Sequence, residues 1–290
     1  MTDPAVSLVV VCHEMARELP RTIRSLTAPY QNRRVPGERE IIIVDNGSAC
    51  PPTAEQFAAL DAEPRILCLP DATVSPVAAV NAGLAAARGS LIGVWIDGAR
   101  LASPGLVDAC LAAAALHPRP VIATLNYQLG PALQFDSARR GYDQAAEDRL
   151  LASIGWPTDG YRLFDVAVSE LRGGPAGPIL ESNALFLPRA LWDELGGYDP
   201  AFIEPGGGLG NADAFLRACA LPDVQLIRIL GEGTFHQFHG GLSTSAPERA
   251  MQTLQQGTRA YLRRRGRPPN PLRTQGWLFD ARASRVIDRP

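Results

Sequence analysis

Apolar runs alternate with helical patterns along the first 116 residues, and this alternation limits the possible folds more than any other feature of the chain. The runs are short and contain no polar alternation, which is typical of strands in a parallel sheet covered by helices on both faces. The strands expected from the pattern are Val6–Cys12, Glu40–Val44, Arg65–Leu69 and Leu91–Ile96, and the helices are Glu18–Leu26, Thr53–Leu60, Pro76–Arg88 and Gly105–Leu116. The sequence therefore predicts an α/β fold with a mostly parallel central sheet that binds its ligands at the carboxyl ends of the strands.

The pattern weakens between residues 126 and 178, where glycine, proline and charged residues are frequent. We interpret this segment as an excursion that builds or covers an acceptor site. Regular structure is expected to resume at Ile179–Leu187, followed by a helix from Pro188 to Gly196 and a helix around Asp213–Ala220. A late strand is expected at Val224–Leu230, and then a helix from Pro247 before an irregular, proline-rich end. We expect one domain over residues 1–245, with a nucleotide-binding half at about 5–125 and an acceptor half at 126–245, and a tail at 246–290.

Composition excludes several classes of function. The formal net charge is -2, so no basic field would hold nucleic acid by its phosphates. All 28 Lys+Arg residues are arginine, which excludes Schiff-base catalysis, pyridoxal phosphate anchoring and a Walker-type phosphate lysine. The five cysteines are scattered without a CxxC pair, which favours reduced thiols in a cytoplasm. No apolar run is long enough to span a bilayer, and no signal-peptide pattern is present, so a glycolipid would be met peripherally at the membrane surface.

Two aspartates directly follow apolar runs. Asp45, which begins Asp-Asn-Gly-Ser, can accept hydrogen bonds from the base of a nucleotide or can start an Asx turn. Asp97 can bind a divalent metal or a ribose hydroxyl, or can form a turn. The first predicted turn, Cys12–Arg17, contains no glycine, which disfavours a dinucleotide-binding fold and a nicotinamide or flavin oxidoreductase.

These segments resemble the family 2 glycosyltransferases of the GT-A fold, in register over most of Val6–Gly240. The opening strand and turn match the start of the family, Asp45-Asn46-Gly47-Ser48 matches its Asp-Asp-Gly-Ser turn, and the segment from Asn81 to Gly89 matches the helix before its metal-site strand. The resemblance implies a nucleoside-diphosphate sugar as donor and contact between Asp45 and the nucleotide base. The other residues it implies near the nucleotide are Cys12, His13, Glu14, Asn81 and Arg88. For Asn81 and Arg88, an equally weighted alternative is that they bind structural partners in the protein instead of the nucleotide.

The resemblance also implies a divalent metal, Mn²⁺ or Mg²⁺. Asp97 falls on the first aspartate of the family's Asp-x-Asp motif, whereas Ala99 stands where the second, metal-ligating aspartate is usual. His236 and His239 lie where the family has a later histidine, and His236 is the better candidate of the two. In the alternative arrangement, Arg100 supplies the positive charge that the leaving diphosphate requires.

The catalytic base is the least determined part of the predicted site. Gly197-Tyr198-Asp199 resembles the family segment that precedes its catalytic Glu-Asp motif, and the alignment then places Asn211 at the base position. An amide cannot take a proton at a useful pKa. The carboxylates that could act as the base instead are Asp213 and Glu204, which rank about equally, and then Glu181.

The sequence therefore predicts a glycosyltransferase that moves a sugar from a nucleoside-diphosphate sugar to a glycan or glycolipid acceptor. The resemblance implies inversion of configuration and a role in assembling a bacterial cell-surface polysaccharide or glycolipid. Two alternatives are a sugar-phosphate nucleotidyltransferase and a non-catalytic binder of nucleotide sugars or glycans. The missing carboxylates at Ala99 and Asn211 are the best support for the binder.

Overall fold

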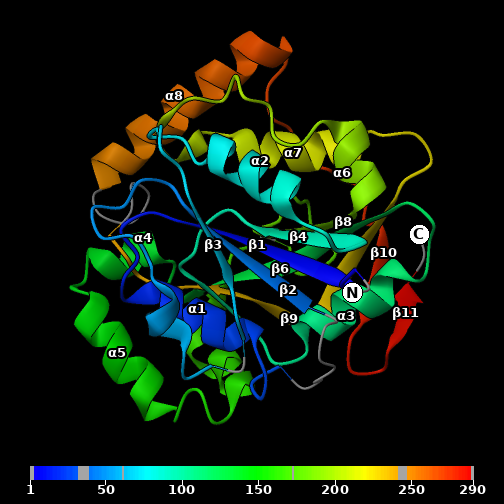
Figure 1. Cartoon of the computed structure of the whole chain (residues 1–290). Coiled ribbons are helices and arrows are strands. Elements are labelled where there is room, and N and C mark those ends of the chain that lie inside the picture. Colours follow the sequence, from blue (N-terminus) through cyan, green and yellow to red (C-terminus); the bar gives the residue numbers. More distant parts are fainter. Residues whose placement is uncertain (1–2, 32–38, 61, 172, 241–246, 289–290) are drawn as a thin grey trace.

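A mixed sheet forms the centre of the molecule in the computed structural model, which describes residues 3–31, 39–60, 62–171, 173–240 and 247–288. Figure 1 shows this sheet between two layers of helices. The strands are β1 (Val6–Cys12), β2 (Arg39–Asp45), β3 (Arg65–Cys68), β4 (Leu91–Trp95), β5 (Arg100–Ala102), β6 (Pro120–Leu129), β7 (Ala167–Ser169), β8 (Ala184–Pro188), β9 (Gln225–His236), β10 (Trp277–Asp280) and β11 (Arg285–Asp288). The α/β class and the helices on both faces are confirmed.

Two layers of helices cover the sheet because each strand in its middle is apolar on both faces. The helices are α1 (Glu18–Leu26), α2 (Val77–Ala86), α3 (Leu106–Ala114), α4 (Gln134–Ala138), α5 (Gln144–Ser153), α6 (Arg189–Leu195), α7 (Gly210–Ala218) and α8 (Pro247–Arg265), with 3-10 turns at Ala54–Phe57, Gly160–Val166 and Pro205–Gly207. One core packs α2, α6 and α7 on one face, and the other packs α1 and α3 on the opposite face (Figure 1).

Most neighbouring strands along the sheet are parallel, as predicted, but the sheet also contains an antiparallel strand in its middle. The order is β11-β10-β9-β6-β8-β4-β1-β2-β3, and the pairs among β1 to β4 are parallel as expected. However, β8 runs antiparallel to both of its neighbours, β4 and β6, in the middle of the sheet. A buried strand reads as an apolar run in either direction, so the sequence pattern does not fix the direction in which it pairs.

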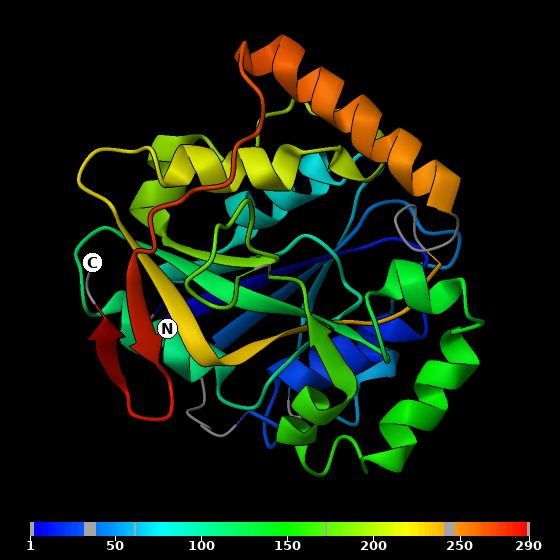
Figure 2. The ribbon, with the colours of Figure 1, turned by 180° about the vertical axis from the view of Figure 1, so that it is seen from behind.

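Other departures lie in the second half of the chain. The excursion at 126–178 carries the end of β6, the helices α4 and α5, and the short strand β7. The end of the tail is not irregular, because β10 pairs with β9 and forms a hairpin with β11 at the edge of the sheet (Figure 2). The predicted boundary at residue 245 lies outside the described residues. The predicted helix Thr53–Leu60 is only a 3-10 turn over Ala54–Phe57. Among the described residues, no helix combines the length and the apolar character needed to cross a membrane.

Candidate functional site

The two aspartates predicted to bind the donor lie at the same edge of the sheet. Asp45 is the last residue of β2 and pairs in register with Cys12, the last residue of β1. Asp97 follows β4, which pairs with β1 on its other side. Because neighbouring strands lie about 4.8 Å apart, one intervening strand separates the two positions by about 10 Å. The structure thus brings both aspartates to the carboxyl edge that α/β folds use for ligands.

Asp45 holds the loop that follows it. Its carboxylate accepts hydrogen bonds from the backbone N–H groups of Gly47 (3.2 Å) and Ser48 (3.0 Å) and from the Ser48 hydroxyl (2.5 Å). Gly47 has φ +81°, a backbone conformation that glycine adopts at no steric cost. The carboxylate is therefore buried inside an Asx turn and shapes the loop.

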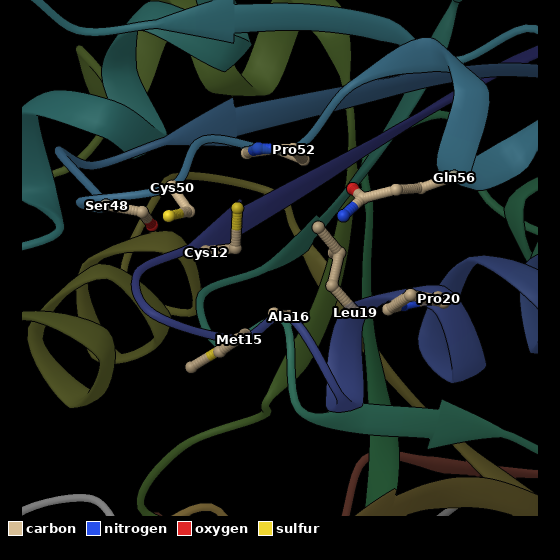
Figure 3. A pocket seen from close by; sticks show the side chains of 9 residues that line it. All are labelled: Cys12, Met15, Ala16, Leu19, Pro20, Ser48, Cys50, Pro52 and Gln56. Carbon is tan, nitrogen blue, oxygen red and sulfur yellow. The ribbon is translucent and has the colours of Figure 1, made fainter.

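A pocket lies between this loop and the turn after β1 (Figure 3). Its lining includes Cys12, Met15 and Leu19 on one side and Ser48, Pro52 and Gln56 on the other. His13 and Glu14 join the two walls: the His13 ring lies 3.1 Å from the Asn46 carbonyl, and the Glu14 carboxylate accepts a bond from the Ala49 N–H. Burial raises the pKa of the Cys12 thiol, which therefore stays protonated and is no nucleophile.

Asp97, His236 and His239 converge at the end of β4. The Nε2 atom of His236 lies 2.9 Å from Asp97 Oδ2, and His239 Nε2 lies 3.6 Å from the same oxygen. The two Nε2 atoms are 3.2 Å apart, and all three ligand atoms lie within 4.8 Å of one another. The other carboxylate oxygen, Asp97 Oδ1, accepts a hydrogen bond from the Ala99 N–H, so Oδ2 is presented to the imidazoles. We call Asp97, His236 and His239 the Asp-His-His cluster.

The members of this cluster shift one another's pKa values. Burial acts to raise the pKa of Asp97, but the neighbouring His239 and His236 rings outweigh it, so the pKa lies well below its usual value. Burial and the nearby Arg100 lower the pKa of His236, which favours the neutral imidazole that binds metals. Burial alone would lower the pKa of His239, whereas the Asp97 charge raises it.

Arg100 is a buried cation, and two of its nitrogen atoms have no hydrogen-bond partner among the described residues. It stands opposite His236 across the β5–β9 pair, which directs both side chains to the same face. Its side chain is nearly inaccessible, and Nε and Nη1 have no partner among the described residues. A buried guanidinium is costly unless it is paired, so this position suits an anion.

The carboxylate of Glu181 lies beside Asn211 at the start of α7. Asn211 donates from Nδ2 to Glu181 Oε2 (3.0 Å) and to the side-chain oxygen of Asn183 (3.1 Å), and accepts a bond from the Tyr198 hydroxyl (2.9 Å). Burial raises the pKa of Glu181, opposed by the Asn211 hydrogen bond; the Glu170 charge raises it further and the Arg100 charge lowers it. Glu181 therefore brings an acid–base group to the position where the sequence has only an amide.

The other two candidate bases are engaged in ion pairs. Asp213 accepts hydrogen bonds from Arg217 (2.7 Å) and Arg265 (2.6 Å), and is fully buried between α7 and α8. Glu204 pairs with Arg264 at 2.8 Å. The structure thus uses two arginines of the basic run 263–267 to dock α8 on the rest of the molecule.

Two residues expected near the nucleotide have structural partners. The Asn81 amide makes two hydrogen bonds with the backbone of Tyr198, at 2.8 and 2.9 Å. Arg88 pairs with Glu40, which lies near the start of β2 and thus at the opposite edge from Asp45. The reason is the course of α2, which carries the chain back from the carboxyl edge to the amino edge before β4 begins. Arg88 therefore does not belong to the site.

One residue of the site had no signal in the sequence. Gln134 is fully buried at the start of α4, and its amide contacts both the ring and the carbonyl of His236. It falls in the excursion at 126–178, where no motif distinguishes it from other polar residues.

Solved structures resemble this fold at low sequence identity. Residues 1–349 of S. aureus TarS match with a TM-score of 0.53 at 12% identity, covering 89% of this chain and 65% of that one. The same region in complex with UDP-GlcNAc gives a TM-score of 0.54 at 13% identity, covering 89% and 66%, and the longer S. aureus TarS gives 0.52 at 12%, covering 89% and 39%. The chain therefore spans about two thirds of the shorter TarS structure and well under half of the longer one. No curated protein matches the sequence.

The family comparison covers more than half of the chain. The model of "Glycosyl transferase family 2" matches residues 7–165, a range that includes Asp45, Asp97 and Arg100. The chain belongs to glycosyl transferase family 2.

Proposed function

We propose that this glycosyltransferase uses a nucleoside-diphosphate sugar as donor and binds it along the carboxyl edge of the sheet. The observation that carries the proposal is the convergence of Asp97, His236 and His239 at this edge, on the far side of β1 from the pocket beside Asp45. We place the base at the mouth of this pocket, between Cys12 and the loop held by Asp45, with His13 and Glu14 in the turn that contacts that loop. The S. aureus TarS structure with bound UDP-GlcNAc supports UDP sugars as the first donors to test.

The Asp-His-His cluster fits a divalent cation. One carboxylate oxygen and two imidazole nitrogens suit Mn²⁺ better than Mg²⁺, which prefers oxygen ligands. In this arrangement, His239 supplies the ligand that Ala99 cannot. A cation held by these three residues would neutralise negative charge that develops on the leaving diphosphate. Arg100 lies on the same face and adds a fixed positive charge for the phosphate oxygens.

We assign the catalytic base to Glu181. Its carboxylate accepts the proton of the acceptor hydroxyl while the oxygen of that hydroxyl attacks the anomeric carbon and the bond to the diphosphate breaks. The raised pKa of Glu181 makes it a better proton acceptor than an ordinary exposed carboxylate. Direct displacement of this kind inverts the configuration at the anomeric carbon.

The acceptor is proposed to be a glycan or glycolipid of a bacterial cell surface, met at the inner face of the plasma membrane. This rests on the family and on the scattered cysteines, whose spacing favours reduced thiols. Residues 263–267 offer a peripheral contact with lipid only through the arginines that α8 docking leaves exposed.

The test measures release of nucleoside diphosphate from UDP, GDP and dTDP sugars, with Mn²⁺ or with chelator, alongside calorimetric titration of the free nucleotides. We expect turnover with one donor class, supported by Mn²⁺ and lost in Asp97→Asn and His236→Ala. Nucleotide binding without turnover for any donor would instead support the non-catalytic binder. Turnover indifferent to chelator would reject the metal site.

A further inference from the structure

Gln134 makes both of its side-chain hydrogen bonds to a single residue, His236. Its Nε2 atom lies 2.8 Å from the His236 backbone oxygen, and its Oε1 atom lies 2.6 Å from His236 Nδ1. The side chain is fully buried, so water cannot replace either bond. The Gln134 backbone is also held, because its N–H donates to the Gln128 side-chain oxygen.

These two bonds determine which ring nitrogen of His236 carries hydrogen. A backbone carbonyl only accepts hydrogen bonds, so the NH₂ end of the Gln134 amide must face it. The amide oxygen then faces the ring, and an oxygen there requires Nδ1 to be the donor. In a neutral imidazole with hydrogen on Nδ1, the lone pair is on Nε2.

The Nε2 lone pair points into the Asp-His-His cluster. It meets the Asp97 carboxylate at 2.9 Å and His239 Nε2 at 3.2 Å. Electron-rich atoms at these distances repel one another unless a cation or a proton lies between them. The arrangement around Gln134 therefore presents His236 as a ligand rather than as a hydrogen-bond donor to Asp97.

We propose that Gln134 is the positioning residue of the metal site, holding His236 in the tautomer and ring orientation that bind a divalent cation. This inference rests on the proposed metal site. Partners of this kind behind metal-binding histidines typically change metal affinity 10–100-fold when they are removed.

The experiment measures Mn²⁺ affinity directly, by electron paramagnetic resonance of the free ion, in the full-length protein without donor. Gln134→Met keeps the volume but removes both hydrogen bonds, and we expect Mn²⁺ binding about 10–100-fold weaker. Gln134→Glu keeps an acceptor for Nδ1–H but places a second oxygen against the His236 carbonyl, so we expect an affinity between those of the wild type and Gln134→Met. The matched control is Gln31→Met, which removes another buried glutamine that donates to two backbone carbonyls, those of Ser25 and Ser103.

The outcomes separate this inference from the metal site itself. A wild-type protein that binds no Mn²⁺ contradicts the metal site, and the inference fails with it. Wild-type binding that Gln134→Met leaves unchanged overturns the role of Gln134 alone. Equal weakening in Gln31→Met, or a Gln134→Glu variant as weak as Gln134→Met, reduces Gln134 to a packing residue. If Gln134→Met does not fold, the Mn²⁺ affinity of Gln134→Glu is compared with that of the wild type. Weaker binding supports the role of Gln134, and unchanged binding overturns it.

Discussion

At the scale of single residues, the proposed base Glu181 is held by Asn211, the residue that the resemblance places at the family's catalytic aspartate. Asn211 occupies the position at the start of α7, and its amide orients the Glu181 carboxylate at 3.0 Å. Asp213, which the sequence ranks above Glu181 as a candidate base, makes two ion pairs instead. The choice of base thus depends on contacts between residues 30 positions apart, which no local pattern contains.

Substitutions of the two carboxylates should separate chemistry from stability. We expect Glu181→Gln to lower kcat by about 100-fold or more while nucleotide affinity stays unchanged. Asp213→Asn should lower the free energy of unfolding by about 3 kcal/mol, because it removes the buried charge that pairs with the partly exposed Arg217 and Arg265, and should keep the kcat of the folded fraction. Full turnover in Glu181→Gln would show that Glu181 is not the catalytic base.

The pH dependence of the rate provides a second check on Glu181. Its pKa lies above the usual value, chiefly because of burial, and a base works only when deprotonated. Activity should therefore rise with pH through this raised pKa, and the residual rate of Glu181→Gln should lack the rise. The rate is measured as a function of pH for the wild type and for Glu181→Gln. If both rates rise with pH in the same way on the acidic side, the titrating group is not Glu181.

At the scale of elements, α5 contributes a titratable contact to the segment that carries the two histidines. The Glu147 carboxylate accepts a hydrogen bond from the Phe238 N–H at 2.7 Å and pairs with Arg17 at 3.3 Å. Burial raises the pKa of Glu147 to about 7, although these bonds oppose it. The native state therefore holds this proton at pH values where the unfolded chain has lost it.

This raised pKa has a defined effect on stability. Its contribution is complete below the unfolded pKa of about 4.5 and is lost as pH rises to about 7. We expect the wild type to lose stability relative to Glu147→Gln across that range, with a constant difference outside it. Chemical denaturation at a series of pH values measures the difference, and a flat difference from pH 4 to 8 would contradict it.

Local patterns predicted the elements of the first half of the chain better than those of the second half. Val6–Cys12 and Glu18–Leu26 coincide with β1 and α1 because apolar run and helical periodicity are both local properties. The direction of β8 and the pairing of β10 with β9 depend on contacts distant in sequence, and neither followed from the pattern. In the site, the resemblance to the family suggested the members of the Asp-His-His cluster. The position of Arg88 depends on the course of α2, which the sequence motifs do not contain.

At the scale of the whole molecule, the two edges of the sheet have different tasks. The carboxyl edge carries the proposed donor site, and the amino edge carries a charge cluster in which Glu40 binds Ser7, Arg65 and Arg88. Burial acts to raise the pKa of Glu40, but the hydrogen bonds from Ser7, Arg88 and Arg65 outweigh it and lower the pKa to about 2. This cluster therefore stabilises the fold at the edge opposite the proposed donor site.

A variant of the amino edge should leave binding intact. We expect Glu40→Gln to lower stability at neutral pH, because the depressed pKa contributes stability above about pH 4.5 that is lost as pH falls toward 2. The difference from the wild type should shrink over that acidic range, and UDP affinity at pH 7 should not change. A large loss of UDP affinity would show that Arg88 and its partner belong to the site after all.

The most direct test of the account is anomalous diffraction at the manganese edge from a crystal soaked with UDP and Mn²⁺. The account predicts one strong peak in coordination contact with Asp97, His236 and His239, with the diphosphate beside it and the base in the pocket beside Asp45. A peak elsewhere, or a nucleotide bound away from this edge with the Asp-His-His cluster empty, would contradict it.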